Sequence, residues 1–226
     1  MKSIVLLSGG LDSATCLALA LDGTSPKNVL AVNMYYGQKH DKEMQAARNI
    51  AIYYGVELME LDLSAIFAKS DCSLLKGSSQ EVPHGTYVEQ QKGTAGKPVS
   101  TYVPFRNGLM LSAAASIAVS VGAGVIYYGA HADDAAGNAY PDCSPEFAES
   151  MNMAINRGTD YKCRIIAPFI RCNKTDIVRY GLEHGVPYEL TWSCYEGGEK
   201  PCGKCGTCID RIKAFEANGK KDPLQY

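Results

Sequence analysis

Residues 3–13 read Ser-Ile-Val-Leu-Leu-Ser-Gly-Gly-Leu-Asp-Ser, and this stretch decides the fold. The apolar run over 3–7, rich in β-branched side chains, predicts a buried strand, and the composition of 14–21 predicts a helix. Between them, the adjacent glycines of the segment 8–10 permit positive φ and leave no Cβ to block a ligand. This order brings the free N–H groups and positive dipole end of a helix to one turn. The stretch therefore predicts an anion site, with phosphate as the usual occupant.

The polar residues of this turn indicate what kind of phosphate site it is. Ser8 and Ser13 supply hydroxyls, and Asp12 supplies a carboxylate. An ordinary strand-to-helix turn needs only one such residue, Asp12 or Ser13, as a helix cap. The P-loop pattern G-x-x-x-x-G-K-[ST] is absent, since no Lys follows the glycines. The stretch instead resembles the Ser-Gly-Gly-x-Asp-Ser signature of the PP-loop ATP pyrophosphatases. That family cuts ATP between its α- and β-phosphates to adenylate a substrate.

The resemblance implies that the turn and its neighbours bind ATP, through Leu7, Ser8, Gly9, Gly10, Leu11, Asp12, Ser13, Ala14 and Thr15. The leaving pyrophosphate would lie over the same residues, at the N-terminus of the helix. Asp12 is the protein ligand we expect for Mg²⁺, because that ion prefers hard oxygen donors and accompanies nucleotide phosphates.

Composition narrows the classes of partner. The chain has 226 residues, a formal net charge of −2 and 46% hydrophobic residues, values typical of a globular domain. We expect no nucleic-acid partner, because no basic excess is present. We expect no membrane partner and no signal peptide, because no apolar run approaches the about 18 residues that span a bilayer. The chain is therefore expected in the cytoplasm, with its nine cysteines mostly reduced.

Strands alternate with helices along the first three quarters of the chain. Further apolar runs predict strands at 29–33, 56–61, 125–129 and 163–166. Helical spacing and capping residues predict helices at 41–55, 109–121, 144–156 and 173–184. This rhythm predicts an α/β fold with a doubly wound, mostly parallel sheet, Rossmann-like and of the adenine nucleotide alpha hydrolase type. Ligands of such sheets bind at the carboxyl ends of the strands.

Two segments interrupt that rhythm. Residues 68–103 are rich in Ser, Gly, Lys, Thr and Pro, and both a lid over the substrate and a solvated loop fit this composition. Residues 191–226 carry a cysteine cluster and a terminal helix at 207–218. We therefore expect a nucleotide-binding and catalytic domain over 1–190, followed by a small metal-binding segment over 191–226.

Polar residues gather where three of the predicted strands end or the next helices begin. Catalytic roles are expected for Asp12, Lys39, His40, Arg106 and Asp133. Lys39 and His40 would offset the charge of leaving pyrophosphate, Arg106 would clamp a phosphate or carboxylate, and Asp133 would share the Mg²⁺ or position the nucleophile. The acceptor substrate is expected to be bound by Gln38, Arg106, Asn107, Asp142 and Cys143. Taken singly, each residue is equally compatible with a surface salt bridge or a helix cap.

The cysteines at 194, 202, 205 and 208 follow the spacing C-x7-C-x2-C-x2-C. Two-residue gaps let neighbouring thiolates converge on one ion, and four sulfurs without histidine fit a closed structural zinc site formed by Cys194, Cys202, Cys205 and Cys208. An iron–sulfur cluster also fits four cysteines, whereas a disulfide framework fits a cytoplasmic chain poorly. Cys143 lies beside acidic residues that oppose the lowered thiol pKa a covalent role needs.

Motifs spread along nearly the whole chain resemble the 7-cyano-7-deazaguanine synthases of the queuosine pathway. Besides the phosphate turn, they are Tyr36-Gly37-Gln38-Lys39-His40, Val103-Pro104-Phe105-Arg106-Asn107, Tyr140-Pro141-Asp142-Cys143, Ser193-Cys194-Tyr195-Glu196 and Cys202-Gly203-Lys204-Cys205-Gly206-Thr207-Cys208. One position departs from the family pattern, because Lys39 stands where many members are expected to have Arg. The positive charge is kept.

The resemblance implies a C–N bond-forming ligase that uses ATP, Mg²⁺ and ammonia to convert 7-carboxy-7-deazaguanine to the nitrile, through an adenylated carboxylate and then an adenylated amide. It further implies small-molecule substrates, free ammonia as the nitrogen source, structural Zn²⁺ and a homodimer. Three alternatives stay open: a tRNA-modifying PP-loop enzyme, an enzyme that joins the deazaguanine carboxyl group to another amine, and a nucleotide-sensing zinc protein. The slightly acidic charge opposes the first, and the three polar clusters oppose the last.

Overall fold

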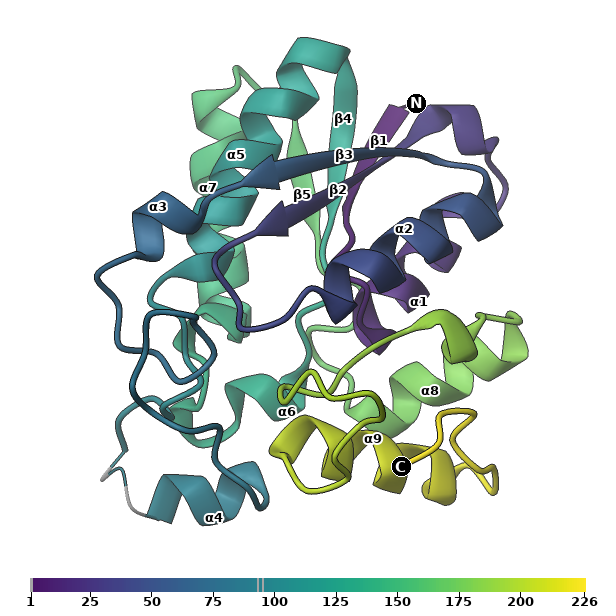
Figure 1. The fold of residues 1–226 in the computed structure, drawn as a ribbon. Helices are drawn as coiled ribbons and strands as arrows, with labels where there is room; N and C mark the ends of the chain where they lie inside the picture. The colour runs from purple at the N-terminus through teal and green to yellow at the C-terminus, as the bar shows by residue number, and fades with distance from the viewer. Residues whose placement is uncertain (1, 93, 95) are drawn as a thin grey trace.

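A computed structural model describes residues 2–92, 94 and 96–226. Its centre is a five-stranded parallel sheet with the order β3-β2-β1-β4-β5 (Figure 1). The strands are β1 Lys2–Leu6, β2 Val29–Tyr35, β3 Glu57–Asp62, β4 Ala123–Tyr127 and β5 Arg164–Ile166. The order reverses between β1 and β4, which are neighbours in the sheet but far apart in sequence. The predicted doubly wound α/β fold is confirmed.

Helices cover both faces of the sheet (Figure 1). The long helices are α1 Leu11–Leu21, α2 Lys42–Tyr54, α5 Arg106–Val121, α7 Pro145–Gly158, α8 Lys174–Glu183 and α9 Gly206–Ala217. Shorter elements are α3 Ser64–Phe67, α4 Tyr87–Lys92, α6 Ala132–Ala135, and the 3₁₀ turns η1 Pro26–Asn28, η2 Ala136–Asn138, η3 Pro141–Cys143 and η4 Tyr188–Leu190. Because α5 is rich in alanine, it lies close to β1 and β4.

Two hydrophobic cores follow from the alternation of side chains along the central strands. Ile4 of β1 faces the core under α5 and α7, with Leu111 and Ile126. Val5 faces the opposite core under α1, α2, α8 and α9, with Ile50 among its members. These residues are at most 1% exposed. Apolar burial on both faces anchors the carboxyl ends of β1 and β4 side by side, at the point where the strand order reverses.

Two helices begin earlier than the sequence pattern predicts. Helix α1 begins at Leu11 rather than Ala14, with the extended residue Gly10 as its N-cap. Asp12 therefore lies in the first helical turn, where a carboxylate is favoured by the helix dipole. Helix α5 begins at Arg106 rather than Leu109, after Phe105 in the left-handed conformation. Both shifts place predicted site residues on rigid helix termini.

Residues 68–103 contain helix α4 and a small core of their own. Leu74, Leu75 and Cys72 are buried against Tyr36 at the end of β2. Isolated bridges join Gln38 to Leu75 and His84 to Cys205, so the segment contacts both the stretch after β2 and the cysteine-rich segment. Positions 93 and 95 of this predicted loop lie outside the described residues. The packed segment forms one side of the molecule, and a lid motion stays a prediction.

The C-terminal segment is joined to the rest through a buried arginine. Arg211 of α9 is 1% exposed and donates hydrogen bonds from Nε and Nη2 to the carboxylate of Asp222, at 2.7 and 3.0 Å. Its Nη1 donates to Thr191 Oγ1 at 2.6 Å, and its Nη2 also donates to the carbonyl of Tyr188. This buried ion pair and its hydrogen bonds hold together the segment before the cysteine cluster, at Tyr188 and Thr191, and the C-terminal tail, at Asp222. Division of the chain at residue 190 stays a prediction.

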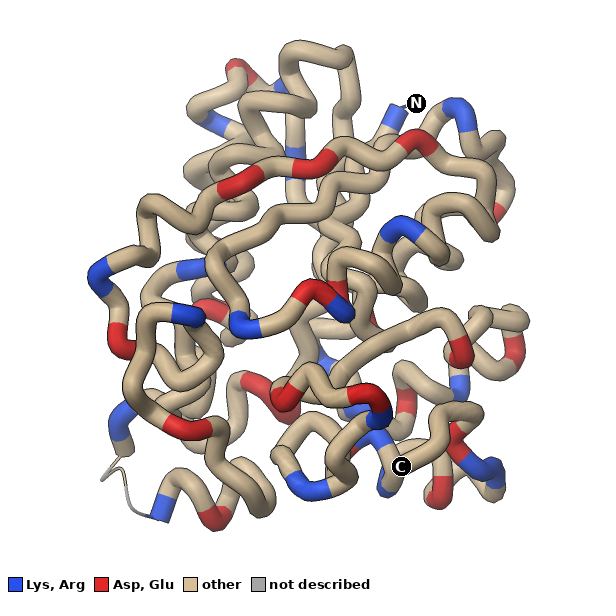
Figure 2. The backbone as a smooth tube through the Cα atoms, viewed as in Figure 1, with Lys and Arg blue, Asp and Glu red and all other residues tan. Residues whose placement is uncertain are grey.

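Charged residues of both signs are distributed along the whole molecule. Lys and Arg are interspersed with Asp and Glu over the backbone (Figure 2). Within residues 2–92, 94 and 96–226, no helix combines the length and the apolar character needed to cross a bilayer.

Candidate functional site

The turn after β1 has the geometry of a phosphate site. Gly9 has a φ of +92°, and a Cβ at this position would lie 2.1 Å from the carbonyl oxygen of Glu43, so helix α2 packs directly on the turn. Ser8 Oγ and Ser13 Oγ lie 3.0 Å apart, and the N–H of Gly10 donates to Ser8 Oγ at 3.3 Å. The turn thus presents two hydroxyls beside the first N–H groups of α1.

Asp12 is held by a lysine that follows β5. The Nζ of Lys174 donates to Asp12 Oδ2 at 2.6 Å, and the lysine side chain is 11% exposed. Burial raises the pKa of Asp12, but Lys174 and the neighbouring His131 more than offset this and lower it below its usual value. Asp12 Oδ1 is buried and has no hydrogen-bond partner among the described residues. One oxygen of the carboxylate is therefore paired and the other is free to bind a ligand.

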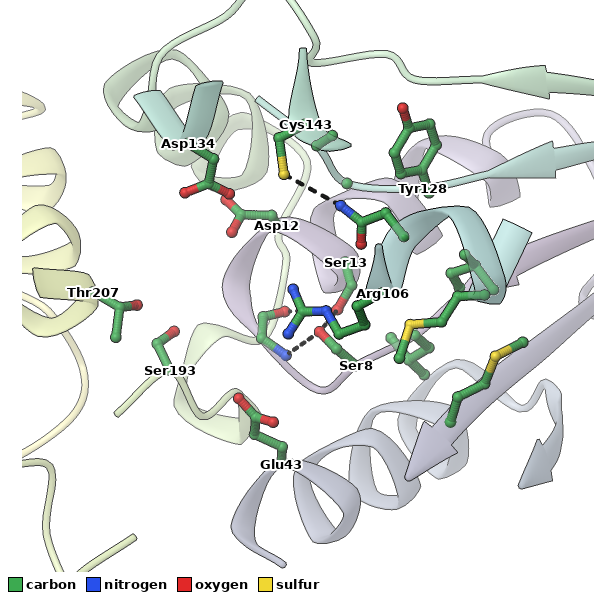
Figure 3. Close-up of a pocket in the computed structure, with 18 of the residues that line it drawn as sticks. Ser8, Asp12, Ser13, Glu43, Arg106, Tyr128, Asp134, Cys143, Ser193 and Thr207 are labelled. Carbon is green, nitrogen blue, oxygen red and sulfur yellow. Dashed lines mark hydrogen bonds between the residues drawn. The ribbon is translucent and has the colours of Figure 1, made fainter. Parts of the chain in front are cut away.

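Arg106 and Asn107 enter the same pocket from the first turn of α5. The N–H of Asn107 donates to Asp142 Oδ2 at 2.9 Å, and its Nδ2 donates to Cys143 Sγ at 3.2 Å. The Arg106 guanidinium lies 5.0 Å from the ring centre of Tyr36 and extends toward the turn that carries Ser8 (Figure 3). Asp142 positions Asn107, which leaves the planar fork of Arg106 facing the pocket.

The opposite wall comes from segments far apart in the sequence. The hydroxyls of Tyr87 and Tyr195 lie 3.0 Å apart, and Tyr140 lies 2.6 Å from Thr101 and 3.4 Å from Tyr195. Burial raises the pKa of the Tyr140 hydroxyl to about 12, so it stays protonated near neutrality. Tyr87 and Tyr195 line the pocket. Such an aromatic wall suits a flat, planar ligand.

The structure brings most of the predicted site residues together. The pocket is lined by Leu7, Ser8, Gly10, Asp12, Ser13, Gln38, Arg106, Asn107 and Cys143. Eight predicted residues lie outside the lining. Four belong to the turn and helix α1, namely Gly9, Leu11, Ala14 and Thr15, and the other four are Lys39, His40, Asp133 and Asp142.

Asp142 accepts the hydrogen bond from the N–H of Asn107 described above, and Lys39, His40 and Asp133 each have a different contact. Lys39 Nζ donates to the carbonyl of Gln80 at 2.7 Å, on the exposed side. His40 packs against Trp192 with 6.4 Å between ring centres. Asp133 Oδ2 accepts a hydrogen bond from the Lys174 N–H at 2.7 Å.

Sequence reasoning did not identify several residues that line the pocket. Among them are Glu43, Lys174, Asp134, Asp210, Tyr87 and Tyr195. Lys174 follows the helix cap Asn173, and Glu43 lies in the first turn of α2; no local motif distinguishes either residue from an ordinary helical charge. The order of the strands is the signal that could have located Lys174, because α8 begins beyond β5 at the same edge of the sheet.

The four cysteines of the predicted metal site lie together. Their sulfur atoms are all within 4.8 Å of one another. The N–H groups of Glu196 and Cys202 donate to Cys194 Sγ at 3.4 and 3.3 Å, and that of Cys205 donates to Cys202 Sγ at 3.3 Å. Such backbone donors stabilise thiolates. The cluster is therefore compatible with a metal ion, and its neighbours Ser193, Tyr195 and Thr207 line the pocket.

Comparisons with known proteins agree with this architecture. The family model described as "Queuosine biosynthesis protein QueC" matches residues 2–219. A 7-cyano-7-deazaguanine synthase from Archaeoglobus fulgidus is 45% identical over 227 residues, covering 99% of this chain and 90% of that protein. One from a Marinomonas species is 41% identical, covering 100% and 98%. The solved NMN synthetase of Francisella tularensis shares the fold, with a TM-score of 0.53, 14% identity, and coverage of 97% of this chain and 78% of its own. The chain belongs to the QueC family of queuosine biosynthesis proteins, and it is an enzyme of the synthase type.

Proposed function

We propose that the chain converts 7-carboxy-7-deazaguanine, ammonia and ATP to 7-cyano-7-deazaguanine, as a C–N bond-forming ligase. One observation carries the proposal: a single pocket joins the phosphate turn of Ser8 and Ser13 to Arg106 and Asn107. A nucleotide and a carboxylate could meet there. The names of the A. fulgidus and Marinomonas relatives, which match over nearly their whole length, support this choice of product.

The first step activates a poor electrophile. The substrate carboxylate, clamped by Arg106, attacks the α-phosphorus of ATP, an oxygen–phosphorus bond forms, and pyrophosphate leaves over the Ser8–Ser13 turn. The N–H groups of α1 and the ammonium of Lys174 stabilise the charge that develops on the phosphates. Asp12 and Asp134 raise the pKa of Lys174 against the effect of burial, so this lysine stays charged.

Ammonia then attacks the acyl carbon, AMP leaves with the bonding electron pair, and an amide forms. A second ATP adenylates the amide oxygen. Loss of AMP and two protons from this intermediate gives the nitrile. Both adenylations need the same charge stabilisation, so one phosphate turn can serve both.

Mg²⁺ fits the free oxygen of Asp12. When bound with ATP, it would neutralise phosphate charge and order the triphosphate. The buried Oδ1 atom of Asp12, which lacks a hydrogen-bond partner in the described part of the chain, is a suitable hard ligand.

Zn²⁺ is our proposal for the ion of the four-cysteine cluster. Four thiolates fill every position of a tetrahedral site, so the ion would cross-link the segment rather than activate water. Metal analysis of the purified protein distinguishes zinc from an iron–sulfur cluster. A homodimer in the cytoplasm completes the proposal, and the molecular mass in solution tests the dimer.

Product analysis tests this function. Purified protein is incubated with 7-carboxy-7-deazaguanine, ATP, Mg²⁺ and ammonium, and the products are identified by mass spectrometry. We expect the nitrile, AMP and pyrophosphate. A conjugate with another amine would instead identify an enzyme that joins the deazaguanine carboxyl group to that amine. Turnover only with tRNA would identify a tRNA-modifying PP-loop enzyme.

A further inference from the structure

Four carboxylates line the pocket: Asp12, Glu43, Asp134 and Asp210. Three of them form one group. Asp12 is paired with Lys174, Asp134 Oδ2 lies 3.2 Å from His131 Nε2, and the charge of Lys174 also acts on Asp210. Asp12 and Asp134 point toward each other at one side of the pocket (Figure 3). These residues lie on the side of the pocket that carries the phosphate turn, which we call the phosphate side.

Glu43 stands apart from that group. It lies in the first turn of α2, whose backbone packs against Gly9, and its carboxyl group points into the pocket, toward the space between Ser193 and Ser8 (Figure 3). Among the described residues it has no ion pair within 4.0 Å. It is therefore an uncommitted carboxyl group beside the arginine proposed to hold the substrate carboxylate.

The surroundings of Glu43 give it an unusual acidity. Burial raises its pKa, the nearby Arg106 of α5 lowers it in part, and the resulting pKa is about 7. The phenol of Tyr36, at the end of β2, also faces it and stays protonated. A carboxyl group of this kind can take up a proton and release it near neutrality.

We propose that Glu43 is the group that accepts a proton from ammonium at the adenylated carboxyl group. This inference rests on the proposed function. Ammonium has no lone pair, so one N–H bond must break before the N–C bond forms, and the carboxylate of Glu43 takes that proton as free ammonia is generated. The nitrogen attacks the acyl carbon, the C–O bond to AMP breaks, and a second proton leaves the nitrogen for solvent. Glu43 then returns its proton to water.

Two partial reactions test this role in Glu43→Gln. Exchange of labelled pyrophosphate into ATP, in the presence of 7-carboxy-7-deazaguanine, reports adenylation alone. Hydroxylamine, which is largely unprotonated at neutral pH, reports transfer to a nucleophile that needs no such base. We expect exchange and hydroxamate formation within about threefold of the parent, but amide formation from ammonium lower by about 100-fold, the usual contribution of a general base.

Glu57→Gln is the matched control, because Glu57 is exposed at the start of β3, and it should leave all three rates unchanged. Glu43→Asp should recover part of the ammonium rate. Equal loss with ammonium and hydroxylamine would overturn the inference, as would loss of exchange, since Glu43 would then bind the substrate or hold the fold. A parent protein that exchanges no pyrophosphate would instead refute the proposed function.

Discussion

The two sides of the pocket are built in different ways. The phosphate side is local: Ser8, Gly10, Asp12 and Ser13 lie within six residues and are ordered by one turn and one helix start. The acceptor side gathers Glu43, Arg106, Tyr87 and Tyr195 from four separate segments. The turn itself needs only β1 and α1, although Lys174 of α8 must reach Asp12 to complete this side. The acceptor side needs segments from most of the chain, including the cysteine cluster.

This difference makes the acceptor side the more fragile of the two. Ser193, Tyr195 and Thr207 of its wall all lie next to cysteines of the cluster. The isolated bridge between His84 and Cys205 ties the segment that carries Tyr87 to the same cluster. A substitution in the cysteine cluster should therefore weaken binding of the acceptor substrate much more than binding of ATP.

The largest effect is expected for Cys205→Ser. In small zinc domains the metal supplies about 10–16 kcal/mol of apparent folding free energy, so the segment should lose its metal and turnover should fall below detection. ATP binding, measured by calorimetry, should survive. Cys172→Ser, outside the cluster, is the control and should keep metal and turnover. Full turnover of Cys205→Ser without metal would contradict the claim that the acceptor side depends on the cysteine cluster.

The next largest effect is expected for Asp12→Asn. The change leaves the buried ammonium of Lys174 without a counter-charge, at a cost of about 3 kcal/mol of stability, and pyrophosphate release should fall by about 100-fold or more. Because the pKa of Asp12 is lowered, its ion pair stabilises the fold above the unfolded pKa and is lost as pH falls through the folded one. Denaturation curves of variant and parent should converge in acid.

Asp160→Asn is the control for that charge change. Asp160 is exposed, and its positive φ of 54° is one that Asn accepts readily. Asp12→Asn with parental pyrophosphate release would remove Asp12 from the phosphate side.

A smaller effect is expected for Arg106→Lys. Lysine keeps the charge but loses the two-pronged contact with a carboxylate, which is worth about 1.5–3 kcal/mol. The KM for 7-carboxy-7-deazaguanine should rise by about tenfold or more, while the KM for ATP stays within twofold. Arg157→Lys, on the exposed end of α7, serves as control. An equal rise in both KM values would place Arg106 on the phosphate side instead.

The smallest effect concerns stability in Glu43→Gln. The folded pKa of Glu43 is raised above its unfolded value of about 4.5, so the carboxyl group destabilises the fold increasingly as pH rises from that value through about 7. The variant should therefore gain Tm over the parent at pH 8 but not at pH 4. A gap in Tm that is the same at both pH values would exclude a raised pKa.

Much of the fold could be predicted because its signals are local. The five strands and the turn at Ser8 depend on neighbouring residues only, and so does the cap Asn173, whose side chain accepts from the N–H of Asp176. The helix starts were less predictable. Gly10 caps α1 without a side chain, and α5 begins through contacts with Asp142, more than thirty residues away.

Residues that depend on tertiary packing could not be predicted. Tyr87 lies in a polar stretch without periodicity, and Lys174 gains its role only when α8 reaches Asp12. Gln38 and Lys39 show a finer limit. The chain bends at Lys39, so Gln38 lines the pocket while Lys39 points out toward Gln80.

The most direct test of the account follows the oxygens of the substrate. With 7-carboxy-7-deazaguanine labelled by ¹⁸O at both carboxylate oxygens, each adenylation should transfer one labelled oxygen to AMP. We predict two molecules of AMP for each nitrile, each with one ¹⁸O in its phosphate. Label in inorganic phosphate together with ADP, or unlabelled AMP, would contradict two successive adenylations in this pocket.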